Sequence, residues 1–125
     1  MELPKELKYT ADHEWVKLDG GRVWVGITDY AQDALGDIVF VGLPKVGDTC
    51  SVGSSIAEVE STKSVSDIYA PVSGEVVSVN EALLENPEIL NSDPYDGGWI
   101  CEISVTDLSA VDALLDSDAY QALIA

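Results

Sequence analysis

Short runs of alternating apolar and polar residues constrain this fold most strongly. Glycine, proline or aspartate separates most of the runs from one another. In the run 22–27, Val23, Val25 and Ile27 share one face, as expected of a strand that is buried on one side. Asp19-Gly20-Gly21 joins this run to the one before it and predicts a hairpin. Further strands are predicted at residues 37–43, 55–60, 65–69, 75–79 and 99–105.

Two segments follow the helical period instead. A two-turn helix is predicted at residues 28–35, because Thr28 or Asp29 can cap its start and Gly36 can end it. Residues 108–124 are also predicted to be helical, with one apolar stripe made of Val111, Leu114 and Leu115. Short strands followed by helices predict a mostly β fold with short helices and a C-terminal helical segment, in one domain that spans the chain.

The charge of the chain excludes two classes of function. The sequence has 23 acidic residues against 6 basic ones, a formal net charge of −17. Nucleic acids and anionic membrane surfaces are bound by lysine and arginine, so neither is an expected partner.

The longest apolar run, residues 38–43, is too short to cross a bilayer. The first seven residues resemble neither a signal peptide nor a transit peptide, which predicts a cytoplasmic protein, or one of the mitochondrial matrix if a transit peptide was removed.

The residues needed for metal binding or nucleophilic catalysis are scarce. His13 is the only histidine, and Cys50 and Cys101 lie far apart without a CxxC motif. We therefore expect two reduced cysteines that pack as small buried hydrophobes, no metal site and no catalytic residues.

Lys63 has an unusual position in the sequence. Lys63 is the only basic residue after Lys45, and it lies within Ser61-Thr62-Lys63-Ser64, whose small polar residues suit a tight turn between two strands. A lysine in such acidic surroundings is ordinarily a solvated side chain that balances nearby charge. However, Lys63 also lies between two similar segments, residues 36–41 and 74–79, which share the pattern glycine, acid, branched apolar residue, valine, any residue, valine.

Glycines near these segments allow the two halves to fold back on each other. Gly47 precedes Lys63 by sixteen residues and Gly74 follows it by eleven, and both are expected to supply corners with positive φ. This arrangement resembles the lipoyl- and biotin-carrier domains, a barrel-sandwich hybrid of two similar halves in which a hairpin presents the modified lysine. Thr62 and Ser64 flank the lysine where biotin carriers resemble Met-Lys-Met, so the lipoyl branch fits better.

The rest of the chain narrows the resemblance to the H proteins of the glycine cleavage system. The similarity extends from Leu7 to Tyr120, in order and at the family's spacing. The resemblance implies a lipoyl-type core at about residues 22–105 and C-terminal helices at about 108–124. Its motifs are residues 7–16, 25–32, 35–44, 60–67, 70–76 and 91–99.

The resemblance implies a carrier and not an enzyme. Lipoic acid would be joined to Lys63 through an amide, giving an N6-lipoyllysine on a swinging arm. The arm would take the aminomethyl group of glycine from a pyridoxal-phosphate glycine decarboxylase to a tetrahydrofolate-dependent aminomethyltransferase. It would pass electrons to an FAD-containing dihydrolipoamide dehydrogenase, and a lipoate-attaching enzyme would modify it first. Lysine is required because arginine offers no primary amine to acylate.

The same resemblance assigns two acidic residues to the cleft that shelters the loaded arm. Glu14 and Asp67 occupy these positions, where a carboxylate would attract the ammonium of the aminomethyl group. Many relatives have histidine at the position of Ala34, and often serine or glutamate at that of Asp12, so the cleft is expected to depend more on carboxylates here.

Two other functions remain open at this stage. The chain could be an H-like lipoyl carrier or relay for another pathway, in which case Glu14 and Asp67 would not need to house a cationic arm. It could also be an interaction domain in which Lys63 is never modified. The modification state of Lys63 separates this last alternative from the first.

Overall fold

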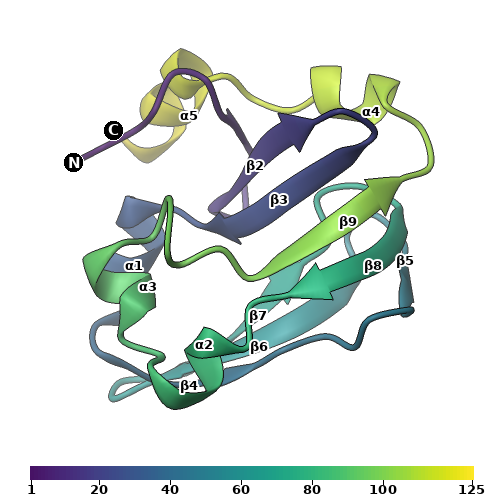
Figure 1. Cartoon of the computed structure of the whole chain (residues 1–125). Coiled ribbons are helices and arrows are strands. Elements are labelled where there is room, and N and C mark those ends of the chain that lie inside the picture. Colours follow the sequence, from purple (N-terminus) through teal and green to yellow (C-terminus); the bar gives the residue numbers. More distant parts are fainter.

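Two antiparallel sheets form the body of the protein (Figure 1). The computed structural model describes all residues from Met1 to Ala125. The larger sheet has six strands in the order β1-β2-β3-β9-β8-β5. Its strands are β1 (Lys8–Tyr9), β2 (Glu14–Asp19), β3 (Arg22–Ile27), β9 (Cys101–Val105), β8 (Gly74–Val79) and β5 (Thr49–Cys50). The smaller sheet has three strands, β4 (Ile38–Gly42), β6 (Ser55–Ser61) and β7 (Val65–Tyr69), with β6 in the centre.

Five short helices surround the sheets. They are α1 (Asp29–Leu35), α2 (Ala82–Glu85), α3 (Ile89–Ser92), α4 (Ser109–Asp112) and α5 (Ser117–Ile124). The predicted helix after β3 is confirmed: the side chain of Thr28 accepts a hydrogen bond from the Ala31 amide at its start, and Gly36, with φ 83°, ends it. None of these helices is long and apolar enough to cross a membrane.

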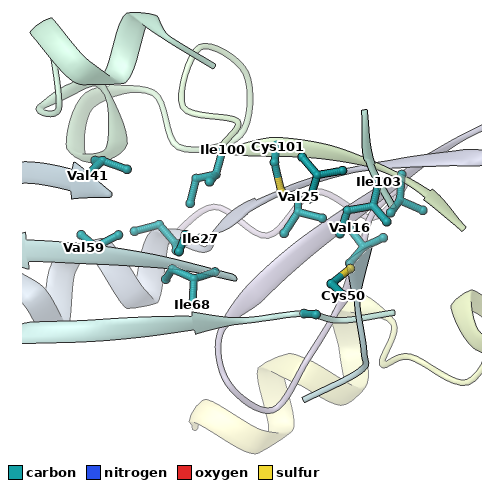
Figure 2. Close-up of a cluster of buried hydrophobic side chains, with 14 of the residues drawn as sticks. Val16, Val25, Ile27, Val41, Cys50, Val59, Ile68, Ile100, Cys101 and Ile103 are labelled. Carbon is teal, nitrogen blue, oxygen red and sulfur yellow. The ribbon is translucent and has the colours of Figure 1, made fainter. Parts of the chain in front are cut away.

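The main hydrophobic core lies between the two sheets. Figure 2 shows Val25 and Ile27 of β3 and Ile103 of β9 in one cluster with Val59 of β6 and Ile68 of β7. Val23 and Val25 are 0% exposed and Ile27 is 1% exposed, so the alternation in the sequence identified the inward face of β3 correctly. Cys50 and Cys101 are buried, unpaired members of the same core, as expected.

The internal repeat supplies one strand to each sheet. Residues 36–41 lead into β4 of the smaller sheet, and residues 74–79 form β8 of the larger one. The predicted hairpin of β2 and β3 is also confirmed, with Asp19 opposite Arg22. Gly47 has the expected positive φ, at 96°, whereas the expectation of a positive φ at Gly74 is wrong.

Gly74 is required by close packing and not by its dihedral angles. A Cβ atom placed on Gly74 would collide with the carbonyl oxygen of Ser104 on the neighbouring strand β9. It would also lie 2.8 Å from a side-chain carbon of Ile103. Backbone atoms cannot move aside as a flexible side chain can, so β8 and β9 could not keep this spacing.

The C-terminal segment differs from the predicted single stripe. The backbone of Leu115 pairs with that of Tyr9 (N···O 2.9 and 2.8 Å), which interrupts the helical segment between α4 and α5. Val111 and Leu114 pack against the main core, while Leu115 packs in a second cluster with Tyr9 and Tyr120. The stripe is therefore divided between two clusters. The sequence also did not predict the two-residue strands β1 and β5 or the one-turn helices α2 and α3.

We expect the Gly74→Ala variant to be less stable than the wild type by at least about 1–3 kcal/mol, the usual cost of overpacking. The added methyl group meets the backbone of Ser104, and relief requires the two strands to separate. Urea unfolding followed by tryptophan fluorescence measures the free energy of unfolding. Gly21→Ala is the matched control, because Gly21 lies in open space without a positive φ. Equal losses in the two variants would contradict the packing explanation.

Candidate functional site

The hairpin of β6 and β7 places Lys63 at its tip. The backbone amide of Ser61 donates to the carbonyl of Ser64 (2.8 Å), and the hydroxyl oxygen of Ser61 accepts from the amides of Lys63 and Ser64, both at 3.1 Å. A further hydrogen bond from the Thr62 amide to the carbonyl of Asp37 (3.0 Å) attaches the turn to the start of β4. The turn is thus fixed at both ends while the side chain of Lys63 is exposed.

The stem of Lys63 passes over a glycine at the end of α1. A Cβ atom on Gly36 would lie 3.2 Å from Cε of Lys63, closer than ordinary contact, so the stem lies directly over Gly36. Lys63 makes no ion pair, since the only pair in the structure joins Arg22 and Glu102 (3.9 Å). The ordinary interpretation of Lys63, a cation that neutralises an acidic neighbour, is therefore not supported by the geometry.

A groove of about 280 Å³ lies beside this lysine. Residues of α1 and β7 supply most of its lining, and Ile27 of β3 together with Asp12 and His13, before β2, completes it. Lys63 does not line the groove itself, but Leu35 does, and the next residue, Gly36, is the glycine over which the stem of Lys63 passes. Both departures from the family pattern, Ala34 and Asp12, line this groove.

Asp67 is an exposed member of the groove lining. It lies on β7, four residues from Lys63, and its Oδ1 accepts a weak hydrogen bond from the hydroxyl of Ser55 (3.3 Å). The neighbouring Ile68 points into the core, because successive strand residues face opposite sides. With Asp12, Asp67 gives the groove two carboxylates that no cation of the protein neutralises.

Glu14 lies behind the groove and does not line it. Its side chain is 1% exposed and accepts hydrogen bonds from the hydroxyl of Thr10 (2.7 Å) and the amide of Tyr69 on β7 (3.3 Å). Burial raises the pKa of Glu14 to about 7, although both hydrogen bonds act in the opposite direction. The structure thus links Glu14 to the strand of Asp67 but gives the two carboxyl groups different surroundings.

Sequence reasoning missed a buried hydrogen-bond chain next to the groove. Nδ1 of His13 lies 2.8 Å from the hydroxyl of Tyr120, and this hydroxyl lies 2.8 Å from that of Thr28, the residue that caps α1. His13 is the only residue other than glycine with a positive φ, at 70°. A lone histidine next to Glu14 was the available signal, but the partner on α5 is 107 residues away in the sequence.

The three tryptophans form part of the core and the wall of a second groove. Trp15 is 1% exposed, and Trp24 and Trp99 pack edge to face with ring centres 4.6 Å apart. With Tyr95 they line a groove of about 440 Å³ that shares no residue with the groove beside Lys63. No three side chains of the metal-binding types are grouped so that they could hold a metal ion.

The buried carboxyl of Glu14 predicts a pH dependence of stability. Its pKa in the folded protein, about 7, lies above the ordinary value of 4.5, so the folded state binds more protons between these values and loses stability as the pH rises. Relative to Glu14→Gln, the wild type should therefore lose about 2–3 kcal/mol between pH 5 and pH 8. Urea unfolding across this range measures the difference. The exposed Glu75→Gln should show no such trend, and a flat difference for Glu14→Gln would contradict the burial argument.

Comparisons with known proteins agree over almost the whole chain. The sequence profile of the family "Glycine cleavage H-protein" matches residues 7–125. The glycine cleavage system H protein of Listeria welshimeri is 59% identical over 121 residues, 97% of each chain. That of Listeria monocytogenes is 57% identical over 124 residues, 99% of each chain.

A solved structure shows the same fold. The crystal structure of a glycine cleavage system H protein from Mycobacterium marinum superposes with a TM-score of 0.88 at 48% identity, and the match covers 96% of this chain and 97% of that one. The predicted barrel-sandwich hybrid is therefore confirmed. Family profile, relatives and fold agree, and the chain belongs to the glycine cleavage H-protein family.

Proposed function

We propose that Lys63 carries a lipoyl group and that the chain is the mobile carrier of the glycine cleavage system. Membership of the family supports a lipoyl carrier role in that system. The observation that carries the finer assignment is the position of Lys63, an exposed and unpaired amine on a firmly bonded turn beside a groove. A lysine that makes no ion pair can become an amide without any loss of an existing interaction.

The surroundings of Lys63 fit a long acyl arm. Gly36 leaves room for the stem, and the groove along α1 offers a place for the acyl chain attached to the amine. When bound, lipoic acid supplies a reversible dithiol–disulfide couple. The protein has no substitute for this couple, because both cysteines are buried, and burial raises the pKa of Cys101 to about 12 and also raises that of Cys50.

The acidic residues of the site suit a cationic cargo. In our proposal Asp67 attracts the ammonium of an aminomethyl group directly, because it is exposed in the groove. Glu14 attracts the same ammonium from behind the groove, where its hydrogen bond to the Tyr69 amide holds the carboxyl group in place. Asp12 adds a third carboxyl group, and the side of α1 that carries Ala34 contributes no charge there.

The carrier is proposed to serve four partners. It would be lipoylated by a lipoate-attaching enzyme, receive the aminomethyl group from glycine decarboxylase, deliver it to aminomethyltransferase and be reoxidised by dihydrolipoamide dehydrogenase. A net charge of −17 predicts that each partner offers a positively charged face, which speeds the encounter. The relatives named above are bacterial, so we propose the cytoplasm as the place of action.

Replacement of Lys63 tests the attachment site. We expect the wild type, produced in a host that supplies lipoate, to show one lipoyl mass increment by intact-mass spectrometry. The Lys63→Arg variant should fold normally and lack the increment, because a guanidinium cannot be acylated by this route. Lys45→Arg is the matched control and should be modified like the wild type. A lipoyl increment on Lys63→Arg would place the attachment site elsewhere.

The role of Asp67 is tested on protein that carries the aminomethyl group. An exposed ion pair is worth up to about 1 kcal/mol, so Asp67→Asn should release ammonia from the arm up to about fivefold faster in the absence of the transferase. Added salt should reduce the difference, since it screens exposed charges. Asp96→Asn, in the tryptophan-lined groove, is the control and should behave like the wild type. Equal release from Asp67→Asn and wild type at low salt would show that Asp67 does not hold the cargo.

A further inference from the structure

The single histidine is held in a defined orientation at the groove. Its backbone has a positive φ of 70°, its carbonyl accepts from the Thr28 amide (3.0 Å), and its ring lies against Tyr30 of α1 with centres 4.8 Å apart. A β-carbon-bearing residue adopts this backbone conformation only where its surroundings enforce it. His13 is therefore fixed by contacts to both the backbone and the side chain.

The hydrogen-bond chain from Thr28 determines where the imidazole carries its proton. The Thr28 hydroxyl oxygen already accepts from the Ala31 amide, and the residue is 0% exposed, so its own hydrogen has only the Tyr120 oxygen as partner. Tyr120 must then donate its hydrogen to Nδ1 of His13. A neutral imidazole that accepts at Nδ1 carries its hydrogen on Nε2.

The second ring nitrogen is free for a ligand. Nε2 of His13 has no hydrogen-bond partner in the protein, and no buried side-chain nitrogen or oxygen lacks a partner, so Nε2 is reached from outside. His13 lines the groove together with Asp12 and Asp67. Burial lowers the pKa of His13 more strongly than Asp12 raises it, which keeps the ring neutral and avoids repulsion of a cationic cargo.

An arm on Lys63 that lay along α1 would have its far end close to this nitrogen. The lysine stem passes Gly36 at the end of α1, and His13 contacts Tyr30 in the first turn. These two positions are about 9 Å apart along a helix with a rise of 1.5 Å per residue. An extended chain of about six bonds, from the amine to the first sulfur-bearing carbon of a lipoyl group, covers a comparable length.

We propose that His13 is a positioning residue, whose neutral Nε2–H, fixed by Tyr120, donates a hydrogen bond to a sulfur at the end of the lipoyl arm. The inference rests on the proposed function, since it needs lipoate on Lys63. A donor at this place stabilises a thiolate of the reduced arm more than the corresponding thiol. The carboxylates of Asp12, Asp67 and Glu14 repel a thiolate and so favour the thiol. Their effect is the same in the wild type and in variants of His13 or Tyr120, so it does not alter the comparison.

The first experiment reads the tautomer on unmodified protein. Nitrogen-15 NMR of the imidazole is unambiguous, because the chain has one histidine. We expect hydrogen on Nε2 and a bare Nδ1 at pH 7.5, and a mixture of tautomers in Tyr120→Phe. Tyr9→Phe is the matched control: Tyr9 is equally buried and its hydroxyl donates to the carbonyl of Pro4 (2.6 Å), so the wild-type tautomer should persist. Hydrogen on Nδ1 in the wild type would overturn the proposal.

The second experiment titrates the thiols of the reduced arm by thiolate absorbance. His13→Gly removes the ring without backbone strain, because glycine accepts a positive φ. We expect the lower thiol pKa to rise by about one unit in this variant, the shift that a charge-assisted hydrogen bond produces. The same pKa in wild type and His13→Gly would overturn the proposal. Absence of the lipoyl mass on Lys63 would overturn the proposed function instead, and mass spectrometry distinguishes the two failures.

Discussion

Packing of one sheet against the other is the interaction on which the site depends. Ile27 of β3 and Ile68 of β7 belong to the core between the sheets, and both also line the groove beside Lys63 (Figure 2). The groove is thus built on close-packed side chains that cannot shift without loss of core contacts. Since Ile68 points inward, its neighbour Asp67 points outward, and the core fixes the direction of the acidic side chain.

The position of Lys63 depends on the same packing indirectly, through the hairpin that carries it. The β6–β7 hairpin extends from the core to a turn that is tied to the start of β4 through Thr62 and Asp37 (Figure 1). The fixed turn places the base of an arm accurately, and the free side chain allows the end of the arm to move. Acylation of Lys63 removes no ion pair, but the other lysines make none either, so the fixed turn and the neighbouring groove are what distinguish Lys63.

Glu14 and Asp67 show how burial separates two carboxyl groups that the sequence presents alike. Asp67 is exposed, so solvent screens its charge and the charge acts weakly on its surroundings. Glu14 is enclosed and bonded by Thr10 and Tyr69, so its charge is costly and its pKa is raised to about 7. A change in the groove that altered the surroundings of Tyr69 would therefore reach Glu14 through that hydrogen bond.

Local sequence pattern was sufficient to predict most of the strands and helices and the turn that carries Lys63. Alternation predicted the strands from β2 to β9 apart from β5, and Thr28 and Gly36 predicted the limits of α1, since these signals act within a few residues. The turn chemistry around Lys63 was visible for the same reason. Pattern failed for β1 and β5, because a two-residue strand has no period of its own and exists only through a distant partner.

The tertiary structure alone decided what depends on contacts between distant parts of the chain. Nothing local marks Gly74 as a close contact with Ser104, or Leu115 as the partner of Tyr9. Likewise, only folding buries Glu14 behind the groove and joins Tyr120 of α5 to His13. The sequence by itself determined which segments form the longer strands, where the turn carries its lysine and which family the motifs resemble. Burial and proton position were decided by the fold, because desolvation and buried hydrogen bonds arise only when segments far apart in the chain enclose the same atoms.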